Sequence, residues 1–371
     1  MRLPALALLL TLTFSTALRG ADKHPKPAPA PDHVGVTARV FHPAASRNWR
    51  GAQAKELHCT IWYPAAASAI EAPQYVGPPD APLFEAGSTA PHAAFAPSLE
   101  KLPIILLSHG SGGSAMQLAW LGTALARAGY VAVAVDHPGN NALEPYTAAG
   151  FVLWWERATD LSNALDGLLA DPELGPHMDA RLVGAAGFSL GGYTVLELGG
   201  ARTDVSVIYD RCRAHPDDNA CHAPEMRDMG SPQQMLETVR KTSGESLARS
   251  ADSFRDPRVR AVFAIAPGLS ETQTAESLRA MRLPVQIVVG SGDTMAPADR
   301  NADWLRMNIH GARETVLPGG VAHYTFLDTC TPAGKQKLGV YCQDATTVDR
   351  DAVHAQVSNM AINFFDRALG K

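Results

Sequence analysis

The chain has 371 residues, 46% of them hydrophobic, and a formal net charge of -5 that arises from 32 basic and 37 acidic residues. The basic residues are dispersed and in the minority, which excludes a dedicated nucleic-acid surface, because phosphate binding draws on clustered Lys and Arg. With 31 Gly and 27 Pro beside this apolar content, the composition supports a large core with many turns and suits small neutral or apolar partners.

Residues 1–20 have the order of a secretory signal peptide: Arg2, an apolar run over 3–14, and small residues at 15–17. We expect cleavage after Ala17 or near Gly20 or Ala21, and export to the periplasm or the medium. Removal of residues 1–20 takes away Arg2 and Arg19 and no acid. A non-cleaved anchor is the alternative. The run is too short to span a bilayer, and no later stretch is long and apolar enough to do so. Residues 21–33, rich in Pro, Lys and Ala, are expected to form a flexible leader.

The folded part is expected to open with two antiparallel strands over residues 34–41 and 56–63, the second ended by Pro64. Residues 65–101 are rich in Ala, Pro and Gly without a sustained period, which predicts a long surface loop.

From residue 102 onward, short apolar runs alternate with amphipathic segments of helix length. This alternation predicts a mostly parallel central sheet with helices on both faces. The predicted strands are 103–107, 131–135, 182–186, 259–265, 285–289 and 314–317, and the predicted helices are 115–128, 153–169, 190–198, 274–281, 298–307 and 352–369.

Residues 202–256 interrupt this rhythm with many charges and a predicted helix near 232–239. We interpret them as an insertion over the site, a cap or lid, within one domain that spans 34–371. A surface excursion without a role is the alternative.

Five cysteines are present. In an oxidising compartment the close pairs Cys212 with Cys221 and Cys330 with Cys342 predict two loop disulfides. Cys59, in a strand-like stretch, is expected to be a buried apolar thiol. Cys212 and Cys221 with His215 and His222 could instead hold zinc, but their spacing matches no strong zinc pattern.

The strongest chemical signal is the run GFSLGG at 187–192, which follows one predicted strand and precedes one predicted helix. In that context the run is a nucleophile elbow, in which glycines allow a sharp turn that lifts a Ser hydroxyl out of the sheet edge. We therefore predict Ser189 as the nucleophile.

A second glycine-rich turn, SHGSGG at 108–113, follows the strand 103–107. Such a turn can aim a backbone N–H at a developing oxyanion, and the residue after the nucleophile supplies the other donor. We predict an oxyanion hole formed by the N–H groups of Ser111 and Leu190. A turn that serves geometry alone is the alternative, and Ser108 and His109 are expected to be structural hydrogen-bonding groups.

A nucleophilic Ser needs a base, and the base needs an orienting carboxylate. Asp293 lies on the turn GSGDT after the strand 285–289, and His323 lies on the loop PGGVAH after the strand 314–317. Substrate sites of open α/β sheets lie at such carboxyl ends of strands. The chain order Ser, acid, His is also the one expected of this architecture. Asp293 and His323 are therefore the predicted acid and base.

Other residues could fill these roles. Glu271 follows the strand 259–265 and is a second candidate acid, whereas Asp328 is expected to be a loop residue. His137 could line the pocket or serve its turn, and His310 and His354 are expected at the surface. The residues expected to surround the pocket are Trp154, Trp155, Phe188, Met295 and Tyr324, although most aromatic side chains belong to cores.

Together, the elbow, the SHGSGG loop, the GSGD turn and the GGVAH loop resemble the α/β-hydrolase superfamily over residues 34–369. The WYP run at 62–64, the SHG loop and the DHPG run at 136–139 resemble bacterial predicted dienelactone hydrolases and platelet-activating-factor acetylhydrolase-like serine esterases. Dienelactone hydrolases use a Cys nucleophile, so Ser189 favours ester hydrolysis. The acetylhydrolase relatives place the acid after an earlier strand, and Asp293 departs from that pattern.

The resemblance implies a carboxylic ester hydrolase of the α/β-hydrolase fold, acting on small-molecule or lipid esters without cofactor or metal, and the predicted signal peptide makes it secreted or periplasmic. A peptidase or amidase on the same scaffold is one alternative. A non-catalytic binding protein derived from a hydrolase is another, although all members of the expected triad are present.

Overall fold

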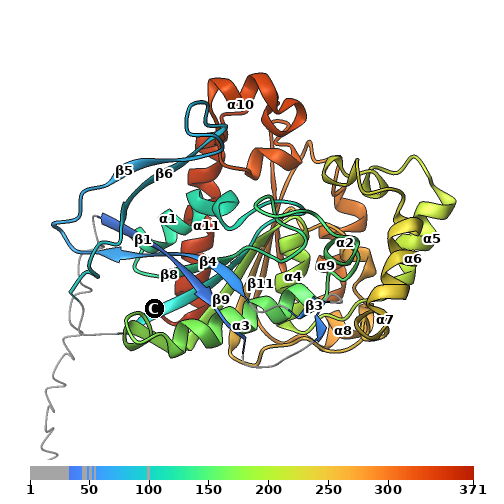
Figure 1. The fold of residues 1–371 in the computed structure, drawn as a ribbon, viewed down its shortest axis with the longest axis horizontal. Coiled ribbons are helices and arrows are strands. Elements are labelled where there is room, and N and C mark those ends of the chain that lie inside the picture. The colour runs from blue at the N-terminus through green and yellow to red at the C-terminus, as the bar shows by residue number, and fades with distance from the viewer. Residues whose placement is uncertain (1–32, 44–47, 50–51, 54–55, 98–100) are drawn as a thin grey trace, which may run out of the picture.

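A mixed sheet of eleven strands forms the centre of the described structure, a computed structural model (Figure 1). The structure describes residues 33–43, 48–49, 52–53, 56–97 and 101–371, so the predicted signal peptide and all of the predicted leader except His33 lie outside it. The strand order is β12-β11-β10-β9-β7-β8-β4-β1-β6-β13, with β5 paired to β6. The six strands from β12 to β8 run parallel, and the neighbours of β4 run antiparallel to it.

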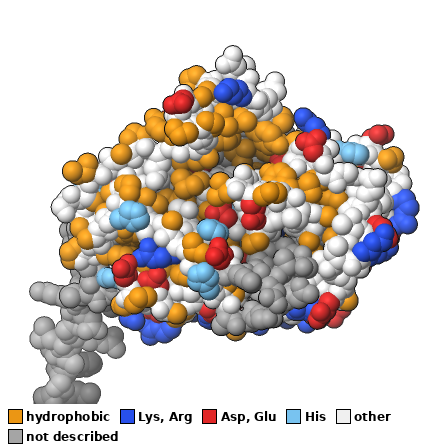
Figure 2. Space-filling model, in the orientation of Figure 1, with side chains coloured by type: hydrophobic (Ala, Val, Ile, Leu, Met, Phe, Trp, Pro, Cys, Tyr) orange, Lys and Arg blue, Asp and Glu red, His pale blue; other side chains and the backbone are white. Residues whose placement is uncertain are grey.

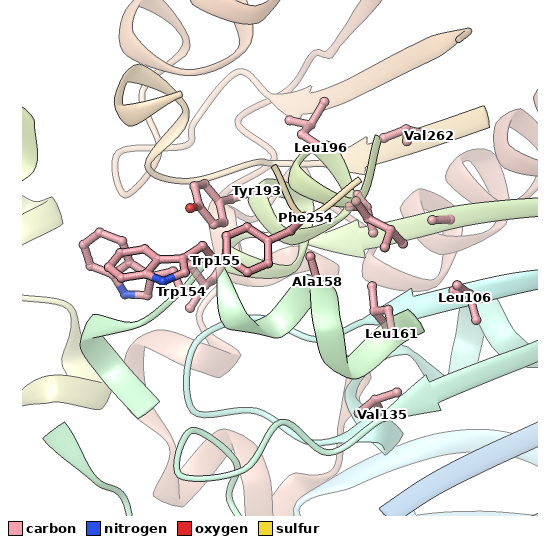
Figure 3. Close-up of a cluster of buried hydrophobic side chains, with 14 of the residues drawn as sticks. Leu106, Val135, Trp154, Trp155, Ala158, Leu161, Tyr193, Leu196, Phe254 and Val262 are labelled. Carbon is pink, nitrogen blue, oxygen red and sulfur yellow. The ribbon is translucent and has the colours of Figure 1, made fainter. Parts of the chain in front are cut away.

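The strands alternate their side chains between two separate cores. In β7 (Leu102–Ser108), Ile104 and Leu106 belong to one core, and Ile105 and Leu107 to the other. Helices α3 (Glu156–Ala170) and α4 (Leu190–Gly199) contribute to the first core, part of which is shown in Figure 3. Helices α1 (Ala119–Arg127) and α11 (Arg350–Leu369) contribute to the second core. Because both faces are covered by helices, the central strands are apolar throughout.

The predicted mostly parallel sheet with helices on both faces is therefore confirmed. The predicted opening pair is also present, as β1 and β4, with β4 extending through Pro64. Pro64 pairs with Val34 of β1, beyond the part of β4 that pairs with β8.

The other strands of the central sheet and two further helices have the following bounds: β1 (His33–Phe41), β4 (Leu57–Ala65), β8 (Val131–Val135), β9 (Met178–Phe188), β10 (Val259–Ile265), β11 (Val285–Gly290), β12 (Arg313–Leu317), α8 (Ala275–Ala280) and α9 (Ala302–Asn308).

The expectation of a long surface loop over 65–101 is wrong. This segment contains β5 (Ala72–Val76) and β6 (Phe84–Pro91), and β6 adds a parallel edge to β1 through Gly35 and Val36. The sequence of β6, FEAGSTAP, consists mainly of small residues that are rare in strands. Its pairing with three neighbours, β1, β5 and β13 (Thr329–Cys330), overrides that local preference.

The segment 202–256 forms three α-helices between α4 and β10. The predicted helix near 232–239 is α6 (Pro232–Thr242), whose first turn has a capping box between Ser231 and Gln234. The sequence did not indicate α5 (Ser206–Ala214) or α7 (Gly244–Ala248). Together with short 3-10 turns, these helices form the side of the molecule coloured yellow in Figure 1.

Both predicted disulfides are present, Cys212–Cys221 and Cys330–Cys342, and Cys59 is a buried free thiol. The first disulfide removes the zinc alternative for Cys212 and Cys221. In the part of the chain that the structure describes, no helix is long and apolar enough to cross a membrane.

Candidate active site

Ser189 occupies the sharp turn between β9 and α4, with φ 55° and ψ -118°. This is strained backbone for a residue with a side chain, and surrounding contacts must hold it. A Cβ on Gly191 would lie 1.9 Å from the Ser108 carbonyl oxygen, and one on Gly187 would lie 2.2 Å from the Gly191 carbonyl oxygen. Only glycine fits at either position, so the glycines of the GFSLGG run are required by close backbone approach.

The imidazole of His323 lies between Ser189 and Asp293. His323 Nε2 is 2.8 Å from Ser189 Oγ, and Nδ1 is 2.7 Å from Asp293 Oδ2. Because an ionised carboxylate only accepts hydrogen bonds, Nδ1 carries the proton of the neutral ring and Nε2 accepts from the Ser189 hydroxyl. The structure thus brings all three predicted residues together, in the arrangement that activates a serine.

Asp293 is held as an anion. Burial raises the pKa of its carboxyl, but the electrostatic interaction and the hydrogen bond with His323, together with two backbone N–H groups, outweigh burial and lower the pKa. Those N–H groups belong to Met295 and Ala296 and lie 2.9 and 2.8 Å from Oδ1. A fixed negative charge at this place stabilises an imidazolium that forms on His323.

The loops that carry Asp293 and His323 are joined to each other. They follow the neighbouring parallel strands β11 and β12, and Gly292 N–H donates to the Val321 carbonyl at 2.9 Å. A Cβ on Gly290 would lie 2.0 Å from that same carbonyl oxygen. The short 3-10 helix η7 (His323–Phe326) then begins at the histidine, which is 6% exposed.

The two predicted oxyanion donors, Ser111 and Leu190, both line the pocket that contains Ser189. On either side of Ser111 the backbone is occupied: Gly110 N–H donates to Gln117 Oε1 at 2.7 Å and Gly112 N–H to Asn140 Oδ1 at 3.0 Å. Among the described residues, no hydrogen bond takes up the Ser111 N–H. Leu190, as the first residue of α4, has no acceptor within its helix.

Arg157 holds the loop 108–113 in place through hydrogen bonds, and the sequence did not indicate this role. Its side chain is fully buried and donates to Asn140 Oδ1 at 2.9 Å and to the His109 carbonyl. A charged pair in the otherwise apolar run LWWERA was the signal that could have indicated a buried polar contact, since Arg is rarely buried without partners.

The pocket beside Ser189 is mostly apolar. Four of the five predicted wall residues line it, namely Trp154, Phe188, Met295 and Tyr324. Trp155 does not: it is fully buried in the first core, where its indole N–H donates to the Ser246 carbonyl at 3.2 Å (Figure 3). Wall residues not predicted from the sequence include Phe151, Ile208, Tyr209, Glu225, Met226, Met235 and Tyr341.

The alternative acids are engaged elsewhere. Glu271 forms an ion pair with Arg211 at 2.7 Å. Asp328 accepts a hydrogen bond from the Trp120 N–H at 3.4 Å, and burial raises the pKa of its carboxyl well above the ordinary range. Neither residue has a hydrogen bond with His323, so of these three carboxyl groups only that of Asp293 contacts the His323 ring.

The alternative histidines also lie outside the pocket. His137 is buried, with Nδ1 2.6 Å from Asp160 Oδ2 and Nε2 2.9 Å from Ser108 Oγ. The expectation that His354 is at the surface is wrong, because its ring stacks on Trp120 and its Nε2 lies 3.0 Å from the Thr325 carbonyl. Helix α11 places it on the buried face, which the sequence period alone did not separate from the exposed one.

Strand order, elbow and converging loops define the α/β-hydrolase fold. In agreement, the solved structure of a ferulic acid esterase from Streptomyces cinnamoneus superposes with a TM-score of 0.58 at 22% identity, over 93% of this chain and 92% of that one. The family model of platelet-activating factor acetylhydrolase, isoform II, matches residues 86–150. No curated protein sequence matches the chain. The expected resemblance to α/β-hydrolases and to the acetylhydrolase group is confirmed.

Proposed function

We propose that the chain is a serine hydrolase that cleaves carboxylic ester bonds through an acyl-enzyme on Ser189. The observation that carries this proposal is the unbroken hydrogen-bonded series from Ser189 Oγ through His323 to Asp293. Beside it lies the N–H of Ser111, to which no described residue offers an acceptor. The names of the two similar proteins, an acetylhydrolase and a ferulic acid esterase, favour esters over amides.

In the proposed mechanism, the Ser189 hydroxyl attacks the ester carbonyl while His323 Nε2 takes its proton. The tetrahedral oxyanion that results accepts hydrogen bonds from the N–H groups of Ser111 and Leu190. The imidazolium, balanced by Asp293, then gives its proton to the leaving alcohol. Water, activated by His323 in the same way, hydrolyses the acyl-enzyme and restores Ser189.

Kinetics of the Ser189→Ala variant test this proposal. We expect kcat/KM for p-nitrophenyl acetate to fall by at least about a hundredfold, because the nucleophile is lost. The matched control, Ser253→Ala, changes an exposed serine and should leave the rate unchanged. An anilide of the same acyl group, run in parallel, separates esterase from amidase. Full turnover by Ser189→Ala would refute the proposal.

We also propose export of the chain after removal of residues 1–20. The two disulfides support an oxidising compartment. Intact mass of the protein recovered from the periplasm or medium tests this, with a mature terminus near residue 18 to 21 expected. Recovery only of the uncleaved chain in the cytoplasm would contradict it.

A further inference from the structure

One acidic side chain, Glu225, lies among the described residues that line the pocket with Ser189 and His323. It is carried by the 3-10 turn η4 (Pro224–Met226), soon after the Cys212–Cys221 disulfide. The surrounding wall is largely apolar, formed by side chains such as Phe151, Trp154 and Phe188. A carboxyl group in such a wall loses hydration, which is unfavourable unless it finds polar partners.

Two tyrosines provide part of that partnership. Tyr324 Oη donates to Glu225 Oε1 at 3.1 Å, and the Tyr341 hydroxyl is a second hydrogen-bond partner. The Tyr324 ring lies 4.7 Å from the Tyr341 ring and 5.3 Å from the His323 ring, measured between centroids. The carboxyl group is therefore fixed close to the proposed catalytic base.

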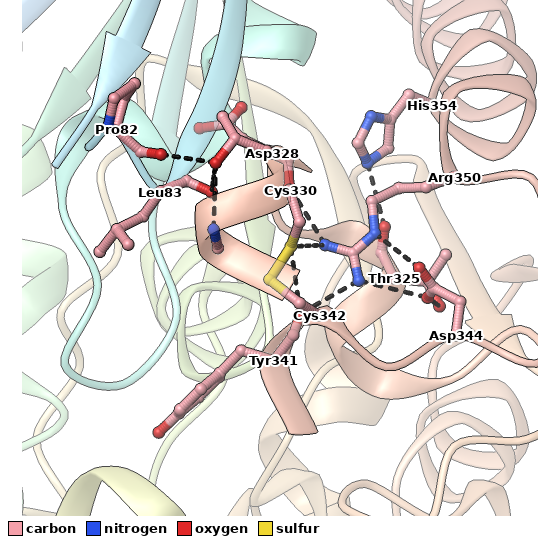
Figure 4. Close-up of a disulfide and its surroundings, with 12 residues drawn as sticks. Pro82, Leu83, Thr325, Asp328, Cys330, Tyr341, Cys342, Asp344, Arg350 and His354 are labelled. Atoms are coloured by element: carbon pink, nitrogen blue, oxygen red, sulfur yellow. Dashed lines mark hydrogen bonds and ion pairs between the residues drawn. A yellow bond between two sulfur atoms is a disulfide. The ribbon is translucent and has the colours of Figure 1, made fainter. Parts of the chain in front are cut away.

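Tyr341 is itself held from outside the pocket. Arg350 donates to the Tyr341 carbonyl at 3.0 Å, and the Cys330–Cys342 disulfide closes the loop that carries this tyrosine (Figure 4). Glu225 follows the Cys212–Cys221 disulfide by four residues, and Tyr341 directly precedes Cys342 of the other disulfide. Each disulfide therefore constrains the segment that carries one of the two residues.

No Lys or Arg among the described residues forms an ion pair with Glu225. Burial raises the pKa of its carboxyl, an effect that its backbone, Tyr324 and His323 oppose. A carboxyl group offers more acceptor positions than two tyrosine hydroxyls use. An apolar residue would fill this wall position at lower cost, unless the pocket receives a molecule that donates a hydrogen bond there.

We propose that Glu225, held by Tyr324 and Tyr341, is a specificity-determining residue that accepts a hydrogen bond from a hydroxyl group on the ester substrate. This rests on the proposed esterase function. The apolar wall receives the body of the substrate. The substrate class is therefore small esters with an apolar body and a free hydroxyl.

The test uses two matched pairs of esters. Methyl 3-(4-hydroxyphenyl)propanoate and methyl 3-phenylpropanoate differ by a hydroxyl on the acyl part, and 2-hydroxyethyl and ethyl 3-phenylpropanoate differ by one on the alcohol part. The readout is the ratio of kcat/KM within each pair. A site built to bind a hydroxyl discriminates against its absence, so we expect a ratio of about ten or more in at least one pair.

Three variants identify the source of that ratio. Glu225→Met should bring it to about one, Glu225→Gln should keep part of it because an accepting oxygen remains, and the exposed control Asp228→Asn should leave it unchanged. Ratios near one in both pairs for the unmodified protein, or ratios that survive in Glu225→Met, would overturn the assignment of Glu225.

Labelling of Ser189 by a fluorophosphonate keeps this outcome separate from the proposed function. A protein that labels and hydrolyses esters without the hydroxyl preference refutes the role of Glu225 alone. A protein that neither labels nor hydrolyses any of the four esters refutes the esterase proposal itself, and with it the inference about Glu225.

Discussion

Ser189 adopts a backbone conformation that the glycines around it make possible, and this dependence can be tested at one residue. In Gly191→Ala the new methyl group would collide with the Ser108 carbonyl, 1.9 Å away, so the turn must move. We expect a loss of about 3 kcal/mol in the free energy of unfolding, as for overpacked cores, and loss of fluorophosphonate labelling. Chemical denaturation and labelling measure the two effects.

The matched control is Gly244→Ala, because a Cβ at Gly244 would meet nothing within 4 Å. That variant should change stability by less than about 1 kcal/mol and keep full labelling. Equal behaviour of the two alanine variants would contradict the close approach at the elbow.

For individual residues, the sequence indicated the proposed catalytic residues but not the residues that surround and position the site. Ser189, Asp293 and His323 each follow a strand in a glycine-rich turn, so local pattern was enough to select them. Arg157 and Glu225 have no such pattern. Their partners, Asn140 and Tyr324, are distant in sequence, and only the folded chain brings each pair together.

Among the elements, α3 holds the loop 108–113, which carries the proposed oxyanion donor Ser111, through Arg157. Arg157→Lys keeps the charge but cannot reproduce a planar guanidinium that reaches both Asn140 and the His109 carbonyl. The Ser111 N–H would then be less well fixed in the transition state. We expect kcat to fall roughly ten- to a hundredfold with KM little changed, measured by steady-state hydrolysis of p-nitrophenyl acetate.

The exposed Arg367 on α11 supplies the control, and Arg367→Lys should leave both constants as they are. If Arg157→Lys raised KM at constant kcat, Arg157 would act on substrate binding and not on the proposed oxyanion donor Ser111.

We propose that the helices of segment 202–256 form an insertion that covers the pocket beside Ser189. Ile208 and Tyr209 of α5 and Met235 of α6 line the pocket together with Ser189. The sequence indicated α6, as a helix near 232–239, but the polar composition of α5 concealed that helix. Its buried residues, Ile208, Tyr209 and Cys212, occupy one narrow stripe.

For the whole molecule, the alternating pattern after residue 102 was sufficient to predict the parallel sheet, because each buried strand reads as a continuous apolar run. The edge beyond β1 was not predictable in this way. There β6 is built from small residues, and its strand conformation depends on neighbours that the local sequence does not specify.

On the face shown in Figure 2, hydrophobic side chains gather in the upper part, toward the region of α10 (Pro332–Lys337).

The stability of the whole fold should depend on pH through His354. Burial lowers the pKa of this histidine to about 4 in the folded chain, against an ordinary value of 6.5. Because the unfolded chain binds the proton first as pH falls, stability is full above pH 6.5 and is lost between 6.5 and 4. The loss amounts to about 3 kcal/mol.

Urea denaturation at several pH values measures this loss. His354→Gln keeps a donor for the Thr325 carbonyl and cannot take up a proton, so its free energy of unfolding should fall less over the same interval. Parallel pH profiles for the two proteins would show that acid sensitivity arises elsewhere.

The central claim is that Ser189 is a nucleophile activated by His323 and Asp293. Its most direct test is to react the protein with a fluorophosphonate and to locate the added mass by peptide mapping. We predict one adduct, on the peptide that contains Ser189, and a markedly slower reaction in His323→Ala. An unlabelled but folded protein, or an adduct on another residue, would contradict the claim.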